Sequence, residues 1–305
     1  MCCLFGFVDY AGSLSVKQKC RLIRELSIAA EVRGTDATGI AYNTSRGLQI
    51  YKRPLAAHRL HLRIPAEAHV VMGHTRMTTQ GSAKKNYNNH PFFGCVKGKR
   101  FALAHNGVLW NDRGLRHTKH LPKTKIQTDS YVAVQLLEQQ KALDFDSLVK
   151  MAEQVEGSFS FAVLDEQDAL WLVKGDNPLT IVHFPAAGVY VYASTAEILN
   201  KALARCGNWL GRGEKVDIAM GDIVKIDSRG HITHGTFDVS KFYRSSWGYW
   251  DTPLYPKAPH SEEEHLALLK SVAKAFGFTS EMIDRLLDQG FTTMEIEELL
   301  YDGGY

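Results

Sequence analysis

Four short apolar segments follow one another between residues 158 and 194, and they constrain the fold of this chain more than any other feature. They read SFSFAVLD, ALWLVKG, LTIVHF and GVYVYAS. Each is rich in aromatic and β-branched residues, and turn residues separate them, which predicts a series of β-strands. Any fold assigned to this chain must therefore contain a substantial amount of sheet.

Further strand and helix patterns follow in groups along the first 240 residues. CLFGFVDY, TGIAYNT, LQIYKR, AHVVMGHTR and RFALAHNGVL predict strands, and GDIVKIDSRGHITHGTF predicts a hairpin. Capping boxes start predicted helices at Ser15, with Gln18, and at Ser194, with Glu197. Helices are predicted over 13–34, 128–140, 146–157 and 194–207. Because strands come in groups and helices in pairs, we expect an α+β layered fold and not alternating βαβ units.

Charge, hydropathy and cysteine content exclude several classes of protein. The chain has 305 residues, a formal net charge of +3 and no long block of Lys or Arg, which argues against nucleic acid and acidic membrane surfaces as partners. No segment reaches the roughly 18 consecutive apolar residues of a membrane span, and no secretory signal pattern is present. The five cysteines include no CxxC pair, so neither a disulfide framework nor a zinc site is expected. We expect a cytoplasmic protein with reduced thiols.

The sequence changes character near residue 240. Residues 241–260 combine Tyr, Trp and Pro and are too aromatic for a free linker. Residues 261–305 contain three short helical patterns with a long apolar stripe, and capping boxes begin at Ser261 and Thr292. We expect three parts: a main domain over 2–240, an aromatic connecting segment over 241–260, and a small helical module over 261–305.

Five short patches carry the candidate chemistry. They are Cys2, RGTDATGIAY (33–42), GHTRMTTQG (73–81) with NNHPF close behind, AHNGVL (104–109) and TDS (128–130). Taken alone, each has a structural explanation as a turn, a helix stop or a helix cap. Their occurrence together, in this order, indicates a functional site.

Together these patches resemble the class II glutamine amidotransferases, whose glutaminase domains belong to the N-terminal nucleophile hydrolases. In that family the chain begins Met-Cys-Gly, and RGxDSxG, GHTRWATxG, HNG and a TD helix start follow in this order. The resemblance covers residues 2–235. It implies a four-layer α/β/β/α sandwich of two antiparallel sheets, and an enzyme that releases ammonia from the side-chain amide of glutamine.

The resemblance makes Cys2 the catalytic nucleophile. After removal of Met1, Cys2 carries both a thiol and a free α-amine, whose ordinary pKa values are about 8.5 and about 8. The amine, directly or through a water, can take the thiol proton, and the thiolate then attacks the amide. By resemblance, the Asn106 side chain and the Gly107 backbone N–H stabilise the oxyanion. Ammonia leaves, and water cleaves the thioester.

The charged end of glutamine needs partners of its own. Arg76 suits the α-carboxylate, since a guanidinium binds a carboxylate through two hydrogen bonds, and Asp129 suits the α-amine. Thr79 is expected to add a hydrogen bond. Arg33 and Asp36 are expected to support the nucleophile, with Arg33 ordering the N-terminus.

Three residues depart from the family pattern. Cys3 stands where the family has Gly, Met77 replaces the usual Trp, and Gln80 takes a position that is often His in amidotransferases of amino sugars. Neighbours on a strand point to opposite faces, so Cys3 is expected to pack away from the pocket. The departures at Met77 and Gln80 put in doubt how the pocket closes and how glutamine hydrolysis is coupled to ammonia use, more than the chemistry itself.

Two other functions are compatible with the same residues. An amidase of γ-glutamyl compounds would use Arg76 and Asp129 equally, because these read only the amino-acid end of the substrate. A catalytically inactive scaffold that binds a partner through its C-terminal helices is the other alternative. Retention of every expected catalytic residue argues against the scaffold.

No cofactor or metal is expected. The histidine pairs in HRLHL and HITH lack acidic or cysteine neighbours and are interpreted as surface residues, and no GxxxxGK[ST] loop is present. The family's large synthase domains have no room in this chain. The expected partners are therefore glutamine and either water, an acceptor at the same site or a separate ammonia-accepting synthase subunit. A homo-oligomer is also compatible with the sequence.

Overall fold

The computed structural model describes residues 2–240, 266, 270, 279–289, 291 and 296. Its internal contacts divide the chain into two units, residues 1–242 and 243–305. Among the described residues, no helix is both long and apolar enough to cross a membrane. The aromatic segment predicted over 241–260 and the capping boxes predicted at Ser261 and Thr292 lie outside the described residues.

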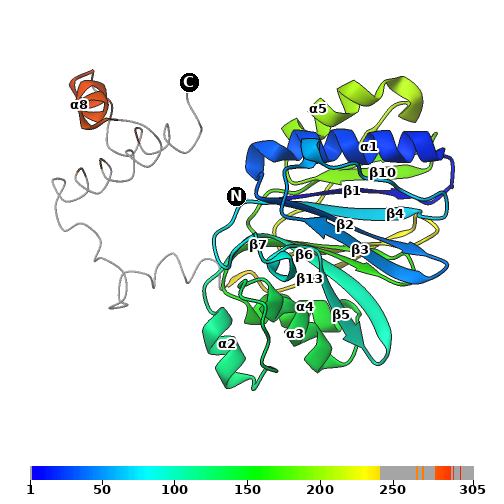
Figure 1. The fold of residues 1–305 in the computed structure, drawn as a ribbon, viewed down its shortest axis with the longest axis horizontal. Helices are drawn as coiled ribbons and strands as arrows, with labels where there is room; N and C mark the ends of the chain where they lie inside the picture. Colours follow the sequence, from blue (N-terminus) through cyan, green and yellow to red (C-terminus); the bar gives the residue numbers. More distant parts are fainter. Residues whose placement is uncertain are drawn as a thin grey trace. The chain divides into compact units, whose positions relative to one another are not determined.

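Two antiparallel sheets form the centre of the first unit (Figure 1). Within the described residues, the first sheet has seven strands in the order β11-β9-β10-β1-β4-β2-β3. Strand β1 lies in its middle, paired with β4 on one side and β10 on the other. The strands are β1 (Cys3–Asp9), β2 (Ala37–Thr44), β3 (Gly47–Arg53), β4 (Val70–Arg76), β9 (Thr180–Phe184), β10 (Val189–Ala193) and β11 (Glu214–Val216).

The second sheet has six strands in the described residues, in the order β13-β12-β8-β7-β6-β5. The strands are β5 (Phe92–Val96), β6 (Lys99–Leu109), β7 (Gly157–Asp165), β8 (Leu170–Lys174), β12 (Asp222–Ile226) and β13 (Ile232–Thr236). The four strands predicted between residues 158 and 194 are therefore all present, but β7 and β8 belong to the second sheet whereas β9 and β10 belong to the first.

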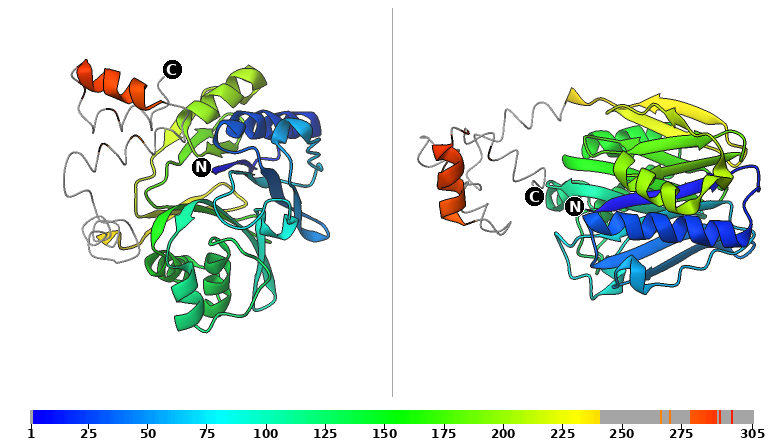
Figure 2. Two further views of the ribbon diagram at one scale, coloured as in Figure 1. Left: turned by 60° about the vertical axis from the view of Figure 1, so that its left-hand side comes forward. Right: turned by 90° about the horizontal axis from the view of Figure 1, so that it is seen from above.

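Helices cover the outer face of each sheet (Figure 2). Leu22 of α1 and Leu199 of α5 belong to the apolar cluster on the first sheet, and Leu136 of α3 and Leu148 of α4 to that on the second. A third cluster fills the space between the sheets. The predicted four-layer sandwich is confirmed. The helices of this unit are α1 (Val16–Ala29), η1 (Ala30–Arg33), η2 (Ala57–Arg59), η3 (Asn86–Asn88), α2 (Asp112–Thr118), α3 (Tyr131–Gln140), α4 (Phe145–Gln154), α5 (Ala196–Cys206) and η4 (Asn208–Leu210).

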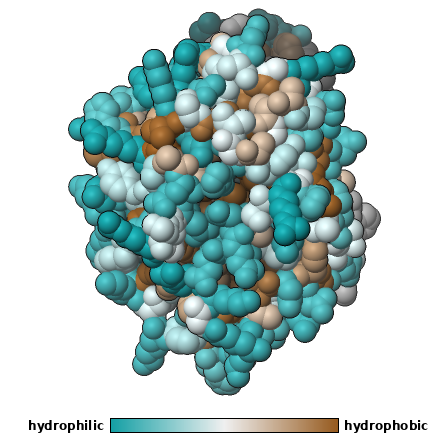
Figure 3. Space-filling model, turned by 90° about the vertical axis from the view of Figure 1, so that its right-hand side faces the viewer, coloured by the Kyte–Doolittle hydropathy of each residue, from teal (hydrophilic) through white to brown (hydrophobic). Residues whose placement is uncertain are grey.

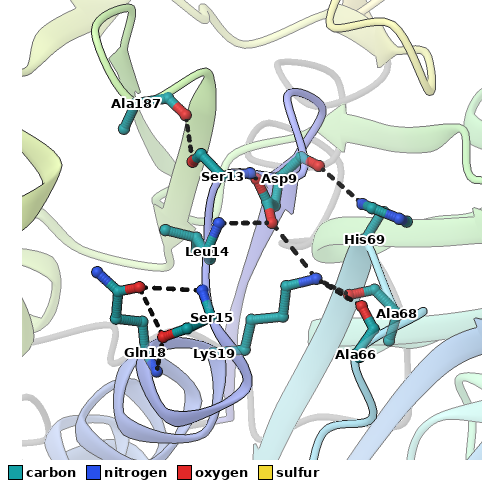
Figure 4. Close-up of polar contacts among 10 residues, drawn as sticks. All are labelled: Asp9, Ser13, Leu14, Ser15, Gln18, Lys19, Ala66, Ala68, His69 and Ala187. Atoms are coloured by element: carbon teal, nitrogen blue, oxygen red, sulfur yellow. Dashed lines mark hydrogen bonds and ion pairs between the residues drawn. The ribbon is translucent and has the colours of Figure 1, made fainter.

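A buried ion pair fixes the connection from β1 to α1 (Figure 4). The Lys19 Nζ lies 3.4 Å from Asp9 Oδ2, and both side chains are almost fully buried, at 1% and 0% exposed. The same ammonium donates to the carbonyl oxygens of Ala66 and Ala68 at 3.0 and 2.9 Å. The Asp9 carboxylate in turn accepts the backbone N–H of Ser13 and Leu14. The predicted capping box of Ser15 and Gln18 starts α1 immediately afterwards and is confirmed.

The capping box predicted at Ser194 is wrong. Helix α5 has Thr195 as its N-cap, and the Thr195 hydroxyl accepts the N–H of Ile198 at 3.3 Å. Ser194 is fully buried and its hydroxyl instead accepts the backbone N–H of Leu4 at 2.9 Å. Both hydroxyl residues suit an N-cap, so the local sequence did not separate them. Because the Ser194 hydroxyl bonds to β1, Thr195 is left as the N-cap of α5. The Ser194 side chain can then contact residues of the candidate site.

The described part of the second unit contains helix α8 (Ser280–Asp288), which confirms one of the three predicted helical patterns. Thr279 caps it by accepting the N–H of Met282 at 3.4 Å. Ile283 and Ile296 are fully buried, and Leu266, Leu286 and Leu287 pack against them. Of the other two helical patterns, residues 266, 270 and 296 are among the described residues, and all three are helical.

Candidate active site

The candidate residues gather at the end of the sandwich that holds the N-terminus (Figure 1). Cys2 directly precedes β1, and Arg76 is the last residue of β4. The antiparallel register pairs Cys3 with Thr75, which brings Cys2 alongside Arg76. Asn106 comes from β6 of the other sheet. Two sheets thus contribute polar side chains to one edge.

Ser194 joins the two sheets at this edge. Its hydroxyl accepts the backbone N–H of Leu4, two residues after Cys2, at 2.9 Å, and also the Asn106 Nδ2 at 3.3 Å. Its own N–H donates to the Leu4 carbonyl at 2.8 Å. One small side chain therefore fixes Asn106 relative to the start of β1. Asn106 is fully buried, and its Oδ1 has no hydrogen-bond partner among the described residues.

Cys2 is buried, at 8% exposed, and its Sγ lies 3.5 Å from the Met77 carbonyl oxygen. Burial raises the pKa of this thiol, and the Met77 hydrogen bond and the charge of Arg76 only partly oppose that shift. The Cys2 thiol consequently needs a base to ionise near neutral pH. Cys3 packs in the apolar cluster under α1 and α5, which confirms that it faces away from Cys2's neighbours.

Arg33 and Asp36 both act on backbone near Cys2. The Arg33 Nε donates to the Cys2 carbonyl at 3.0 Å. The Asp36 carboxylate accepts the N–H of Thr78 at 2.7 Å, and the Asp36 N–H donates to the Arg76 carbonyl at 2.9 Å. The two Asp36 bonds join the loop after β4 to the residue that precedes β2. Thr79 lies in that loop and is exposed.

Arg76 is 2% exposed and its guanidinium is held from three sides. Nη1 donates to Asn89 Oδ1 at 2.7 Å, and Nη2 donates to the carbonyls of Gln80 and Gly81 at 2.6 and 3.1 Å. These bonds use three of the five guanidinium N–H groups and leave two for a ligand. Burial lowers the pKa of Arg76, and the nearby Cys2, Asp129 and Asp36 oppose the shift.

Asp129 is buried just before α3, and both of its oxygens have donors. Oδ2 accepts the backbone N–H of Leu109 at 2.7 Å, and the Ser130 hydroxyl lies 3.4 Å from Oδ1. Ser130 Oγ is also 2.8 Å from His105 Nδ1, next to Asn106. The site strand β6 and the start of α3 are therefore joined by a continuous polar chain.

Gly107 tolerates no side chain. Its φ is +141°, and a Cβ there would lie 1.8 Å from the Ser158 carbonyl oxygen of the neighbouring strand. The glycine lets β6 continue past Asn106 with its backbone close to β7.

Three buried histidines lie behind the site. His74 Nε2 donates to the His105 carbonyl at 2.9 Å, and the His74 and His90 ring centroids are 4.2 Å apart. Burial lowers the pKa of His74 to about 3, and it also lowers the pKa of His90 and of His105. All three are neutral at neutral pH. Among the described residues, no cluster of His, Cys, Asp and Glu could hold a metal ion.

Ser194 was predicted only as a helix cap, and no role in the site was predicted for Ser130, His105 or Asn89. The last three lie inside or beside quoted patches, in TDS, AHNGVL and NNHPF, which was the available signal. Ser194 gave none, because its position suggested a helix cap.

Residues 74–201 match the family model described as a glutamine amidotransferase domain. Among curated proteins, glutamine–fructose-6-phosphate aminotransferase (isomerizing) of Sulfurisphaera tokodaii is 31% identical over 194 residues, or 59% of this chain and 31% of that protein. The same enzyme of Halalkalibacterium halodurans is 32% identical over 201 residues, or 63% of this chain and 32% of that protein. The chain spans about a third of the length of these relatives.

Two solved structures share the fold. Glutamine phosphoribosylpyrophosphate amidotransferase from B. subtilis superposes with a TM-score of 0.60 at 17% identity, over 77% of this chain and 49% of that one. A structure titled as the allosteric regulatory enzyme of purine biosynthesis gives a TM-score of 0.61 at 17% identity, with the same coverage. At this identity the similarity concerns the fold alone.

Proposed function

We propose that this chain, which carries a class II glutamine amidotransferase domain, uses Cys2 to release ammonia from the side-chain amide of glutamine. The strongest support is the bridge at Ser194. It joins the strand that starts after Cys2 to Asn106, the side chain whose Nδ2 would face the developing oxyanion. A nucleophile and an oxyanion donor from different sheets are thereby held in one place.

The burial of Cys2 supports an N-terminal nucleophile. Its raised thiol pKa requires a base, and the lowered pKa values of the three buried histidines behind the site make them weak bases. Once Met1 is removed, the α-amine of Cys2 itself is the nearest basic group. It takes the thiol proton, directly or through a water, and gives it to the amide nitrogen, which leaves as ammonia. Water then attacks the glutamyl thioester, releasing glutamate and restoring the thiol.

The charged groups at this edge support an α-amino acid substrate. Arg76 retains two N–H donors for a carboxylate, and the Asp129 carboxylate offers a negative charge for the α-amine. Thr79 is proposed as a further hydrogen-bond donor, Gly107 as the backbone oxyanion donor, and Arg33 and Asp36 as supports of the nucleophile.

The fate of the ammonia is a separate proposal. The curated relatives are about three times as long as the matched region, so their acceptor activity does not transfer to this chain. We propose that ammonia passes to a separate synthase subunit in the cytoplasm, or to water. We also propose domains over 2–240, 241–260 and 261–305, with the buried Ile283 and Ile296 supporting a helical module that binds this subunit or a second copy.

The test is glutamate and ammonia release by the purified chain, with intact mass confirming loss of Met1. Glutamine and a γ-glutamyl dipeptide are compared as substrates at equal concentration. We expect glutamine to be hydrolysed with a higher kcat/KM. Preference for the dipeptide would favour the γ-glutamyl amidase, and no hydrolysis of either would favour the inactive scaffold.

Deleting 261–305 should leave hydrolysis unchanged and alter assembly, measured by light scattering.

A further inference from the structure

A surface pocket of about 290 Å³ lies where three turns meet in the second sheet's half of the sandwich. They are the β5–β6 turn, the connection from α3 to α4 and the β7–β8 turn. Lys99 lines it and begins β6, the strand that reaches Asn106 seven residues later. At about 3.3 Å per residue, the pocket lies roughly 23 Å from Asn106. It is separate from the candidate active site.

Charged side chains dominate the lining. Lys97, Lys99, Arg100 and Lys141 are the cations, and three carboxylates accompany them. Hydrophilic side chains also cover most of the face of the molecule at the end where the hairpins turn (Figure 3). The charge that this pocket offers to a ligand depends on which of these side chains already form ion pairs.

The three carboxylates are all engaged within the protein. Glu166 pairs with the Arg100 Nε at 3.0 Å. Asp165 Oδ1 accepts the backbone N–H of Gln167 and Ala169, both at 2.9 Å. Asp144 accepts the N–H of Ser147 as the N-cap of α4. They are structural residues of the turns.

The three lysines have no such engagement. In the part of the chain that the structure describes, no ion pair involves Lys97, Lys99 or Lys141, and all three are exposed. Each ammonium carries three N–H donors. The lining therefore combines four cations with three carboxylates, a net charge of +1, and its three lysines are outside any ion pair among the described residues.

Two of these lysines stand where the backbone favours other residues. Lys97 has φ +48° and Lys141 has φ +58°, in the left-handed region that Gly and Asn occupy most readily. Lys97 and Gly98 form the two-residue turn between β5 and β6, since Val96 pairs with Lys99, and Asn-Gly is the favoured pair there. Lys141 is the C-cap of α3, where Gly or Asn is usual. Both residues line the same pocket.

We propose that this pocket binds a phosphorylated small molecule. Its volume of about 290 Å³ lies just below the roughly 300–1,000 Å³ of small-molecule sites, so it suits only a compact ligand such as phosphate or diphosphate. A lysine ammonium serves as a point charge for phosphate, and three lysines outside ion pairs line this pocket. A binding role explains why Lys occupies two positions at which Asn would be less strained.

The test uses inorganic pyrophosphate as the probe and isothermal titration calorimetry on the full chain at constant ionic strength. Lys97→Asn and Lys141→Asn each remove a charge while supplying a residue that adopts the left-handed conformation readily. Each should weaken pyrophosphate binding about tenfold or more, the effect of losing one charged hydrogen bond. The thermal midpoint should not fall, because the strain is relieved. Lys201→Gln, at an exposed position on α5, is the charge-matched control and should bind as the parent does.

The proposal is overturned if pyrophosphate does not bind saturably, or if it binds Lys97→Asn and Lys141→Asn as tightly as the parent. Binding to vesicles with acidic headgroups in the absence of pyrophosphate binding would assign the lysines to a membrane surface and would also overturn it. Glutamine hydrolysis is measured in all variants as a control for folding and is expected to be unchanged.

Discussion

The Nε of Arg33 donates a hydrogen bond of 3.0 Å to the carbonyl oxygen of Cys2. Arg33 is the last residue of η1, the single turn that continues α1. The peptide that follows the proposed nucleophile is therefore held by a side chain from the helical layer. This contact couples the position of the Cys2 backbone to the packing of α1 on the first sheet.

Arg33→Lys should lower kcat for glutamine hydrolysis roughly 10- to 100-fold, the effect of misplacing a reacting group by a fraction of an ångström to one ångström. The substitution keeps the positive charge but removes the planar N–H fork that reaches the Cys2 carbonyl. Steady-state kinetics measures the effect. Arg63→Lys, at an exposed position, is the control. Equal kcat values in both variants would show that the contact is unimportant.

Asp129→Asn should raise KM for glutamine about 10- to 100-fold with a smaller change in kcat, since it removes a charged partner of the α-amine. The amide oxygen can still accept the Leu109 N–H, so the local fold is expected to persist.

Asn106→Ala should have the opposite signature, a fall of roughly 10²- to 10³-fold in kcat, because it removes an oxyanion donor. If both variants lowered kcat alone by similar factors, the assignment of separate binding and catalytic roles would be wrong.

Lys19→Met should lower the free energy of unfolding by about 3–5 kcal/mol, because it leaves the Asp9 carboxylate buried without its ion partner. Urea unfolding at neutral pH measures the change. Lys17→Met is the matched control, two residues earlier on the same helix and exposed. A similar loss in both variants would mean that helix propensity or solubility, and not the buried pair, explains the effect.

Stability should fall as the pH is lowered from about 6.5 toward 3. Burial lowers the pKa of His74 to about 3 and also lowers that of His90. Below the ordinary histidine value of about 6.5, the unfolded chain binds protons that the folded chain does not. Each such histidine therefore lowers the free energy of unfolding by up to roughly 1.4 kcal/mol for each pH unit below that value.

His90→Gln should reduce that slope by the contribution of one histidine. The slope is read from unfolding free energies between pH 5 and 6, a window chosen above the ordinary range of carboxylates, about 4. Both ring nitrogens of His90 are buried without a partner among the described residues, so its protonated form gains no compensating bond in the fold. An unchanged slope in the variant would show that His90 takes up a proton in the folded state as well.

Local patterns predicted most of the main unit's strands and helices, because these depend on side-chain periodicity over a few residues. The orientation of Cys3 followed from strand alternation alone, and it now lies in the cluster under α1. The sheet to which each strand belongs was not predictable in this way. Strand β1 pairs with β4 and β10, which are distant in sequence, and no local signal specifies these partners.

The supporting residues of the site were missed for the same reason. Ser194 contacts Leu4 across 190 positions and Asn106 across 88, so its role exists only once the sheets are assembled. Asn89 holds Arg76 through a side-chain bond between a loop and a strand end. The motif residues were found because they cluster in short sequence patches, whereas residues that position them are scattered.

Covalent labelling at the N-terminus tests the central claim, that Cys2 is the nucleophile, most directly. The purified chain is treated with a glutamine analogue that carries a thiol-reactive electrophile in place of the side-chain amide, and the adduct is mapped by peptide mass spectrometry. Cys3→Ala controls for the neighbouring thiol and should be labelled as the parent is, because Cys3 is fully buried in the apolar cluster. We predict one adduct per chain, on Cys2 of molecules that have lost Met1, with competition by glutamine and none in Cys2→Ala. An adduct on Cys3, or full glutamine turnover by molecules that retain Met1, would contradict the mechanism.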